Sequence, residues 1–278
     1  MPSKIISDEL KEEIINYYLS KPMTYQEIAL KYNLSNPTIG KILKDIPKYP
    51  KAKLFNPDLN ENFFENIDSE SKAYYLGLLI SDGNVFKEDS GRQASISITL
   101  DDNDKYILEK FKNELNTNTS INSDGRGCSQ IAVRSNKMAD DLAKLGVVPR
   151  KSYYTYLPNI DKKYMNHLIR GIFDGDGSIT AKEGYGSGNR YLHAFSFCGS
   201  EQLMKDLSEY LFTTLKLHRK PRVYNYKDRK LSEIKILSIN DMYLFGDWMY
   251  NNATIYLTRK NNIYNNFKTH YNDKKIPS

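Results

Sequence analysis

Two apolar stretches of this sequence, Ala73–Gly83 and Asn166–Gly177, follow the same pattern. Each has the apolar content of a buried helix, ends in Asp-Gly, and is followed at once by residues typical of a strand. An apolar helix that ends in Asp-Gly is common by itself, but two of them in separate parts of one chain indicate a duplication. A duplicated fold would bring the two terminal carboxylates, Asp82 and Asp176, together.

The segments that follow the two stretches repeat one order of elements. The first copy is predicted to contain, in order, strands at Asn84–Lys87 and Gln93–Leu100, a helix around Ile107–Leu115, a hairpin turning at Asp124–Gly127, and a helix over Asn136–Leu145. The second copy has counterparts at Ser178–Lys182, Arg190–Cys198, Leu203–Leu211, Pro221–Ile239 and Asp241–Tyr250. In Gln93–Leu100 apolar residues alternate with serine and threonine, which predicts a strand with one polar face. Both copies end in Arg-Lys, at Arg150-Lys151 and at Arg259-Lys260.

The N-terminal residues predict three short helices, at Ser7–Ser20, Thr24–Asn33 and Asn36–Lys44. Thr24 with Glu27 three residues later fits a capping box, and proline in the first turn of the third helix is well tolerated. This order resembles the helix-turn-helix modules of transposases and small regulators, over about the first 45 residues. The resemblance implies that the third helix enters the major groove. The expected DNA contacts are Ser35, Asn36, Thr38, Lys41 and Lys44. The alternative is a packing domain that binds no DNA.

The net charge of +6 and the pI near 8.9 are only mildly basic, so the distribution of charge is more informative. Lysines crowd the span 41–53, where prolines break regular structure, and Leu54–Ser71 carries acids without lysine or arginine. We therefore expect a basic linker that can follow a phosphate backbone, with contacts from Lys48, Lys51 and Lys53. A second basic run covers Arg219–Lys235. Clusters of this kind are also common on solvated surfaces.

The cysteines, Cys128 and Cys198, are isolated, and the four histidines are scattered, so neither a structural zinc site nor a disulfide framework is expected. No apolar run approaches membrane-spanning length, and the first residues lack the apolar core of a signal peptide. We expect a soluble, intracellular, cytoplasmic protein with no membrane partner.

The two Asp-Gly stretches resemble the motifs of the LAGLIDADG homing endonucleases, in the monomeric form that carries both motifs in one chain. The resemblance spans roughly Ile67 to Tyr271 and is strongest in Gly77–Gly83 and Gly171–Gly177. In that family the motif helices pack against each other at a pseudo-twofold axis. Gly77 and Gly171 match the glycine that lets the helix backbones touch. The sequence departs from the motif at Leu76 and Arg170, which replace a small residue, and at Ile80, which replaces the first acid.

The resemblance implies an α+β fold in which two pseudo-symmetric αββαββα halves form a saddle of two antiparallel sheets, preceded by the small all-α domain. The expected divisions are 1–46 for the helix-turn-helix domain, 47–66 for the linker, 67–158 for the first half and 159–278 for the second half.

The resemblance also implies the chemistry of the site. The motif acids Asp82 and Asp176 are expected to bind Mg²⁺, for which Mn²⁺ and similar ions can substitute. Lys151 and Lys260 match the basic residue that the family places beside the metals, where a cation can steady the phosphate or polarise water. The alternatives are surface salt bridges for these lysines, or Arg150 and Arg259 pointing inward in their place.

The polar strand faces are expected to read the major groove. The candidate contacts are Lys87, Arg92, Gln93, Ser95, Ser97, Arg126 and Arg134 in the first half, and Lys182, Arg190, Arg222, Tyr224, Lys227 and Arg229 in the second.

The function implied by the resemblance is that of a monomeric, site-specific endonuclease for double-stranded DNA that promotes homing of its own coding element. It would cut a long asymmetric site across the minor groove and leave 3′ overhangs. The alternative is a catalytically silent binder of DNA or intron RNA, a regulator or maturase, although retention of both motif aspartates argues against it. An intein is not expected, because the chain begins Met-Pro and ends Lys-Ile-Pro-Ser.

Overall fold

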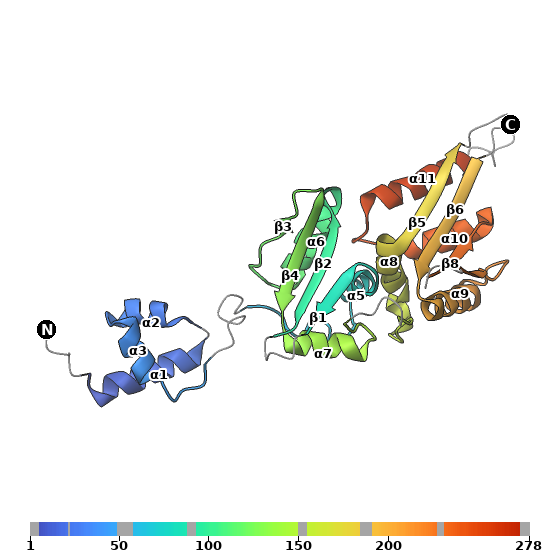
Figure 1. Cartoon of the computed structure of the whole chain (residues 1–278). Coiled ribbons are helices and arrows are strands. Elements are labelled where there is room, and N and C mark those ends of the chain that lie inside the picture. Colours follow the sequence, from blue (N-terminus) through green and yellow to red (C-terminus); the bar gives the residue numbers. More distant parts are fainter. Residues whose placement is uncertain are drawn as a thin grey trace. The chain divides into compact units, whose positions relative to one another are not determined.

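The computed structural model describes residues 6–21, 23–48, 58–87, 93–149, 155–183, 191–226 and 231–272. The chain forms two compact units (Figure 1). The first comprises Met1–Asn60 with Asn116–Asn118, and the second comprises Glu61–Leu115 with Thr119–Ser278. None of the described helices combines the length and the apolar content that a membrane span requires.

The first unit contains three helices, α1 (Asp8–Ser20), α2 (Tyr25–Tyr32) and α3 (Asn36–Ile42), close to the predicted positions. They enclose a small apolar core that includes Ile14, Tyr18, Ile28, Ile39 and Leu43. The predicted capping box is present, because Thr24 and Glu27 each accept a hydrogen bond from the other's backbone N–H.

The second unit contains two halves with the same order of elements. The first half consists of α5 (Glu70–Ser81), β1 (Gly83–Phe86), β2 (Ser95–Asp101), the short η1 (Asp102–Asp104), α6 (Lys105–Glu114), β3 (Asn122–Ser123), β4 (Cys128–Arg134) and α7 (Asn136–Lys144). The second half consists of η3 (Lys162–Tyr164), α8 (Met165–Asp176), β5 (Gly177–Glu183), β6 (Tyr191–Gly199), α9 (Glu201–Leu215), β7 (Val223–Asn225), β8 (Ser232–Ile236), α10 (Ile239–Tyr250) and α11 (Thr258–Asn272). The predicted α+β fold is therefore confirmed.

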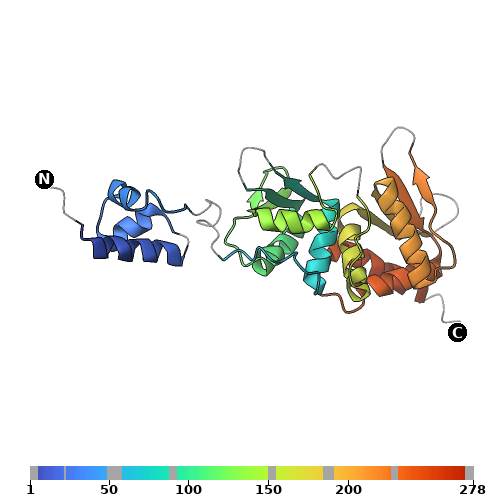
Figure 2. The ribbon, with the colours of Figure 1, turned by 90° about the horizontal axis from the view of Figure 1, so that it is seen from below.

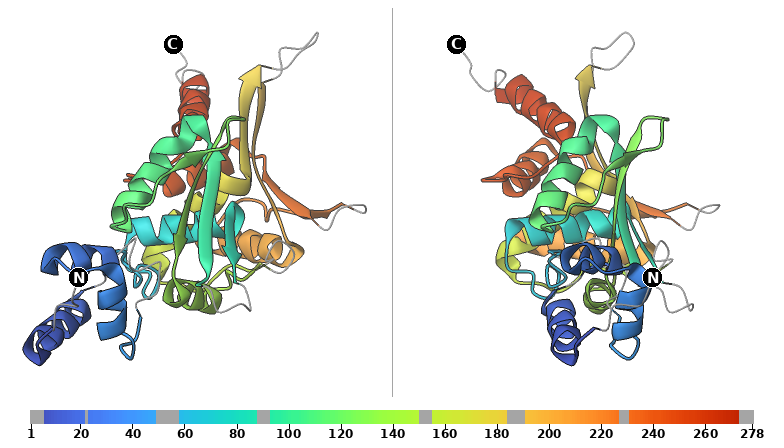
Figure 3. Two further views of the ribbon diagram at one scale, coloured as in Figure 1. Left: turned by 60° about the vertical axis from the view of Figure 1, so that its left-hand side comes forward. Right: turned by 90° about the vertical axis from the view of Figure 1, so that its left-hand side faces the viewer.

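Each half builds one four-stranded antiparallel sheet, with the strand order β1-β2-β4-β3 in the first and β5-β6-β8-β7 in the second. Helices cover one face of each sheet, α6 on the first, and α9, α10 and α11 on the second (Figure 3). Ile96 pairs with Val133 and Ile98 with Ile131, and all four side chains are buried. Residues that stand directly opposite each other share a face of the sheet, so these pairs mark the covered face.

The motif helices α5 and α8 lie side by side in the middle of the second unit (Figures 1 and 2). A Cβ atom added to Gly77 would stand 2.1 Å from the carbonyl oxygen of Leu168, and one added to Gly171 would stand 2.1 Å from that of Tyr74. Since a non-bonded carbon atom cannot approach an oxygen atom so closely, only glycine at these two positions allows the helix backbones to touch. The larger residues Leu76 and Arg170 are fully buried without preventing this approach.

Helix α11 was not predicted from the sequence. It is rich in asparagine, and its buried positions are Lys260, Tyr264 and Phe267. These positions have the spacing of one helix face, but a lysine occupies the first of them, so the apolar pattern is too weak to indicate a packed helix.

Candidate functional site

The two motif aspartates stand at the C-terminal ends of the neighbouring helices α5 and α8. Asp82 is the residue that ends α5, and its backbone N–H donates to the carbonyl of Leu78 at 2.9 Å. Asp176 is the last residue of α8 and is exposed. A Cβ atom on Gly175 would stand 2.9 Å from Oδ2 of Asp82 and would collide with the side chain of Ser81. The missing side chain of Gly175 therefore lets the end of α5 approach the residue next to Asp176.

A cavity of about 200 Å³ lies at these helix ends. Ile80 and Ser81 line it from the first half, and Asp176, Gly199 and Leu203 line it from the second. Since a water molecule takes up about 30 Å³ of liquid volume, the cavity has room for several waters.

The donor set at the helix ends fits a hydrated Mg²⁺ ion. Among the residues that the structure describes, no group of three His, Cys, Asp or Glu side chains is arranged as a metal cage. Mg²⁺ does not need one, because it binds through one or two carboxylates and keeps several waters. Asp82 and Asp176, at the ends of the neighbouring helices α5 and α8, supply two carboxylates, the number that such an ion requires.

Lys260, in the first turn of α11, is only 4% exposed. Its Nζ donates to the carbonyl oxygens of Phe173 (2.6 Å), Asp174 (2.7 Å) and Gly177 (2.6 Å). An ammonium group has three donors, so the end of α8 takes all of them. A cation is favourable there, because a helix carries partial negative charge at its C-terminal end.

Burial and the neighbouring carboxylates have opposite effects on the pKa of Lys260. Burial lowers the pKa of Lys260 to about 8, and the charge of Arg259 acts in the same direction. Asp174, Asp82 and Asp176 oppose this by raising the pKa. Lys260 therefore remains mostly cationic at pH 7 and interacts electrostatically with both motif aspartates.

The other basic candidates are placed differently. Lys151 and the adjacent Arg150 lie outside the described residues. Arg259 donates through Nε to Asp104 of the first half at 2.9 Å, and its side chain is about half exposed. Arg259 thus bridges the two halves instead of pointing toward the ends of α5 and α8.

Asp174, the first acid of the second motif, has a structural role that the sequence did not indicate. It is fully buried, and its Oδ2 accepts hydrogen bonds from the hydroxyl of Tyr74 and the backbone N–H of Leu257, both at 2.8 Å. Burial raises the pKa of Asp174 to about 6, against the positive charge of Lys260. The counterpart of Asp174 in the first motif is the apolar Ile80.

Arg170 is fully buried, and all of its hydrogen bonds are made inside the protein. Its guanidinium donates to the carbonyls of Ile255 (2.7 Å) and Met249 (2.8 Å) and to the carboxylate of Glu70 (2.6 Å). In the sequence, the only sign of this buried cluster was Arg170 itself, a charged residue between the apolar residues of a motif helix.

Several predicted DNA contacts lie on the uncovered faces of the two sheets. In the first sheet the partly buried Ser95 stands opposite the exposed Arg134. Ser97 stands opposite Ala132 but is only 8% exposed, so it is less accessible to DNA than the sequence predicted. In the second sheet Lys182 lies on β5 and Tyr224 on β7, both exposed.

The uncovered face of the first sheet also carries residues that were not predicted as contacts. Asn84 stands opposite Ser97, and Gln130 donates to the hydroxyl of Thr99 on the neighbouring strand at 2.8 Å. The alternation of apolar and polar residues in each strand was the signal that could have identified them.

Most of the remaining predicted contacts of the two halves either interact with acidic side chains, are partly buried, or lie outside the described residues. Lys87 pairs with Asp140 at 3.2 Å, and Arg126 lies beside Asp124 in the β3–β4 turn. Gln93 is partly buried. Arg92, Arg190, Lys227 and Arg229 lie outside the described residues.

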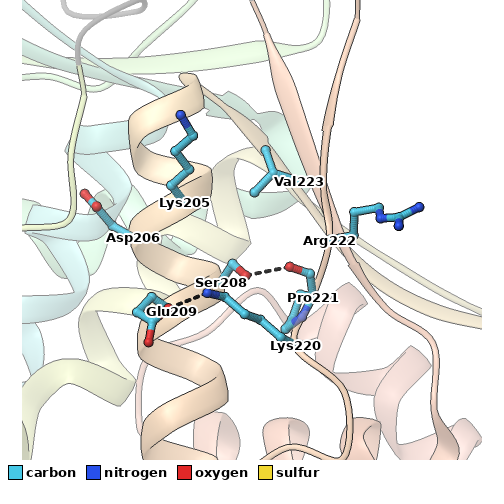
Figure 4. A pocket seen from close by; sticks show the side chains of 8 residues that line it. All are labelled: Lys205, Asp206, Ser208, Glu209, Lys220, Pro221, Arg222 and Val223. Carbon is cyan, nitrogen blue, oxygen red and sulfur yellow. Dashed lines mark hydrogen bonds and ion pairs between the residues drawn. The ribbon is translucent and has the colours of Figure 1, made fainter.

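Arg222 borders a cavity of about 540 Å³ between α9 and the start of β7 (Figure 4). Lys205 and Lys220 line the same cavity, and Lys220 is hydrogen-bonded to Glu209. This cavity carries a mixture of basic and acidic side chains.

In the first unit the predicted contacts lie at the start of α3, in its last turn and beyond its end. The hydroxyls of Ser35 and Thr38 are 2.8 Å apart, and Ser35 caps the helix. Asn36, Lys41, Lys44 and Lys48 are exposed, whereas Lys51 and Lys53 lie outside the described residues.

Solved structures with the same architecture are LAGLIDADG meganucleases. A point mutant of I-SmaMI, in which alanine replaces a lysine, superposes with a TM-score of 0.52 and 14% identity, over 73% of this chain and 92% of that chain. I-SmaMI bound to uncleaveable DNA with a TTGT central four gives 0.53 and 13%, over 76% and 92%. I-AabMI bound to uncleaved DNA gives 0.52 and 12%, over 73% and 90%. The fold is that of the LAGLIDADG meganucleases.

The sequence comparisons are less informative. No family model matches the chain. A stretch of 116 residues is 26% identical to the DNA-directed RNA polymerase subunit Rpo1C of Methanocaldococcus jannaschii. That match covers 39% of this chain and 13% of the length of that subunit.

Proposed function

We propose that this protein is a site-specific, metal-dependent endonuclease that cuts double-stranded DNA. The observation that supports the proposal is the approach of the helix ends that carry Asp82 and Asp176, in a fold shared with meganucleases crystallised on DNA. One acid from each half suits a reaction in which two strands must be cut.

Asp82 and Asp176 would hold the Mg²⁺ ion, and Mn²⁺ could replace it. A divalent cation held there supplies the Lewis acidity that activates water and neutralises phosphate charge. Lys260 adds fixed positive charge beside the two carboxylates and holds the end of α8 that carries Asp176. Lys151 would supply the corresponding positive charge in the first half.

The uncovered faces of the two sheets would lie in the major groove, where Ser95 and Arg134 can hydrogen-bond base edges. Because the two halves differ in sequence, their target would be long and asymmetric. By analogy with the fold family, cleavage would leave 3′ overhangs and promote homing of the coding element. Both halves are in one chain, so we propose that the protein acts as a monomer.

The N-terminal unit would extend the footprint on one flank of the target. Its three helices have the order of a helix-turn-helix module, and the exposed Asn36, Lys41 and Lys44 lie on or just after α3. We assign residues 1–46 to this module, 47–66 to the linker, and 67–158 and 159–278 to the two halves.

The proposal is tested with the full chain, Mg²⁺ and a pool of randomised duplexes from which cleaved molecules are selected and sequenced. We expect cleavage at one long site, lost on addition of EDTA. The variants Asp82→Asn and Asp176→Asn should each abolish double-strand cleavage and still bind the site. Glu109→Gln, which changes an exposed carboxylate on α6, is the matched control and should cut like the wild type.

Undiminished cutting by both aspartate variants would refute the catalytic assignment. Tight binding of a duplex or of an intron RNA by the wild type, without metal-dependent cutting, would instead indicate a silent regulator or maturase.

A further inference from the structure

The N-terminus of α11 is capped by side chains from elsewhere in the fold. The first N–H groups of any helix lack partners within the helix. Here the N–H of Leu257 donates to Asp174 on α8 at 2.8 Å, and the N–H of Thr258 donates to the hydroxyl of Tyr106 at 2.7 Å. Tyr106 belongs to α6, in the other half of the unit.

The Tyr106 hydroxyl is fully used by this contact. It accepts from the N–H and the Oγ1 of Thr258, the latter at 3.1 Å, and it donates to the carbonyl of Tyr256 at 2.9 Å. A phenol has one proton to donate and two lone pairs to accept with, so each is engaged. One side chain of the first half therefore holds the backbone of the second half from Tyr256 to Thr258.

Two further contacts secure the same segment to the first half. Lys110, one helical turn after Tyr106, donates to the carbonyl of Thr254 at 2.9 Å. Asp104, 4% exposed, accepts from Arg259 at 2.9 Å.

Lys260 follows this segment directly, in the same helical turn as Thr258. Its ammonium is in the carbonyl cage at the end of α8 and interacts electrostatically with Asp82 and Asp176. A shift of the α11 N-terminus would therefore move the charge of Lys260 relative to both aspartates.

We propose that Tyr106 is a positioning residue for DNA cleavage, which acts across the two halves by fixing the N-terminus of α11 and hence Lys260. The inference rests on the proposed nuclease function. The first half thus contributes more than its own aspartate, because it also orients the lysine of the second half.

The variant Tyr106→Phe tests this, because it removes only the hydroxyl. Tyr75→Phe is the matched control, since the Tyr75 hydroxyl likewise donates to a backbone carbonyl, that of Ile107 at 3.0 Å. We expect Tyr106→Phe to lower the single-turnover cleavage rate by about tenfold, because small misplacements of catalytic groups are costly. DNA affinity should stay within about twofold, and Tyr75→Phe should lower the rate by no more than about twofold.

A double-variant experiment separates positioning from a general effect on folding. If Tyr106 acts through Lys260, adding Tyr106→Phe to Lys260→Met should slow cleavage no further. Full multiplication of the two effects, or a Tyr106→Phe rate equal to that of Tyr75→Phe, would overturn the inference.

A readout independent of activity separates this inference from the proposed function. In wild type and both tyrosine variants, amide hydrogen exchange is measured over Leu257–Lys260. Exchange there should rise in Tyr106→Phe and not in Tyr75→Phe, whether or not the protein cuts DNA. Equal protection in all three proteins would show that Tyr106 does not hold this segment.

Discussion

The guanidinium of Arg170, in the second motif helix, donates a 2.6 Å hydrogen bond to the carboxylate of Glu70, at the start of the first motif helix. Glu70 also accepts from the N–H groups of Thr254 (2.7 Å) and Ile255 (3.2 Å). One carboxylate therefore joins both motif helices and the segment that leads into α11. Because Arg170 is fully buried, loss of this partner would leave a cation without compensation.

Replacing Glu70 by Gln should destabilise the protein at pH 7 by about 3 kcal/mol, the typical effect of breaking a buried ion pair. Burial acts to raise the pKa of Glu70, but the N–H of Thr254 and the charge of Arg170 outweigh it and hold the pKa below its ordinary value of 4.5. The stabilisation is therefore present above pH 4.5 and is lost as the pH falls through the lowered pKa. Denaturant unfolding from pH 7 to pH 3 should show the gap between wild type and Glu70→Gln closing below about pH 4.5. A gap that stays constant over this range would show that the charge of Glu70 is not the cause.

Adding a methyl group at the seam between the motif helices should prevent their present packing. Gly77→Ala and Gly171→Ala each place a Cβ 2.1 Å from a carbonyl oxygen of the partner helix. Since backbone cannot move aside as a flexible side chain can, we expect a loss of more than about 3 kcal/mol. Gly40→Ala is the matched control in a helix with room, because its Cβ would meet Tyr25 at an ordinary 3.9 Å. That variant should be neutral or stabilising by up to about 1 kcal/mol, because alanine favours a helix. Thermal unfolding followed by circular dichroism measures all three.

The sequence predicted those parts of the fold that depend on local pattern. The apolar period and the Asp-Gly endings identified α5 and α8, and alternation identified strands such as β2. Contacts between residues distant in sequence could not be predicted in this way. Asp174 looked like one more acid near a motif end, and only the folded chain shows its carboxylate at the N-terminus of α11. Lys260 was expected near the motif acids from the family resemblance alone. Its hydrogen bonds to three carbonyls could not be predicted, because they depend on a helix whose apolar pattern is too weak to recognise.

Removing the charge of Lys260 should affect stability and cleavage together. Lys260→Met would leave three carbonyls at the end of α8 without their donor, and each lost partner costs about 1 kcal/mol or more. We therefore expect the free energy of unfolding to fall by roughly 3 kcal/mol, and single-turnover DNA cleavage to slow more than in Tyr106→Phe while remaining measurable. The control is Lys268→Met on the same helix, where the lysine pairs with Asp247 at the surface. Such pairs contribute at most about 1 kcal/mol, so this variant should cut normally. Equal effects of the two substitutions would contradict the role of the carbonyl cage.

Neutralising α3 should weaken DNA binding in a salt-dependent way. The Lys41→Gln, Lys44→Gln double variant lacks two exposed positive charges, one on α3 and one just after it. Each phosphate contact contributes about 0.9 to the slope of log K against log salt concentration, so the slope should become shallower by about 1.8. Lys11→Gln on α1, where the lysine pairs with Asp8 at 2.6 Å, is the control and should leave the slope unchanged. Fluorescence anisotropy with the selected duplex measures the slopes between about 50 and 200 mM salt. Over this range a protein with many phosphate contacts loses about 10³-fold or more in DNA affinity. A similar slope change in both variants would indicate general attraction between a basic protein and DNA. A change confined to the Lys41 and Lys44 variant is expected only if α3 faces the duplex.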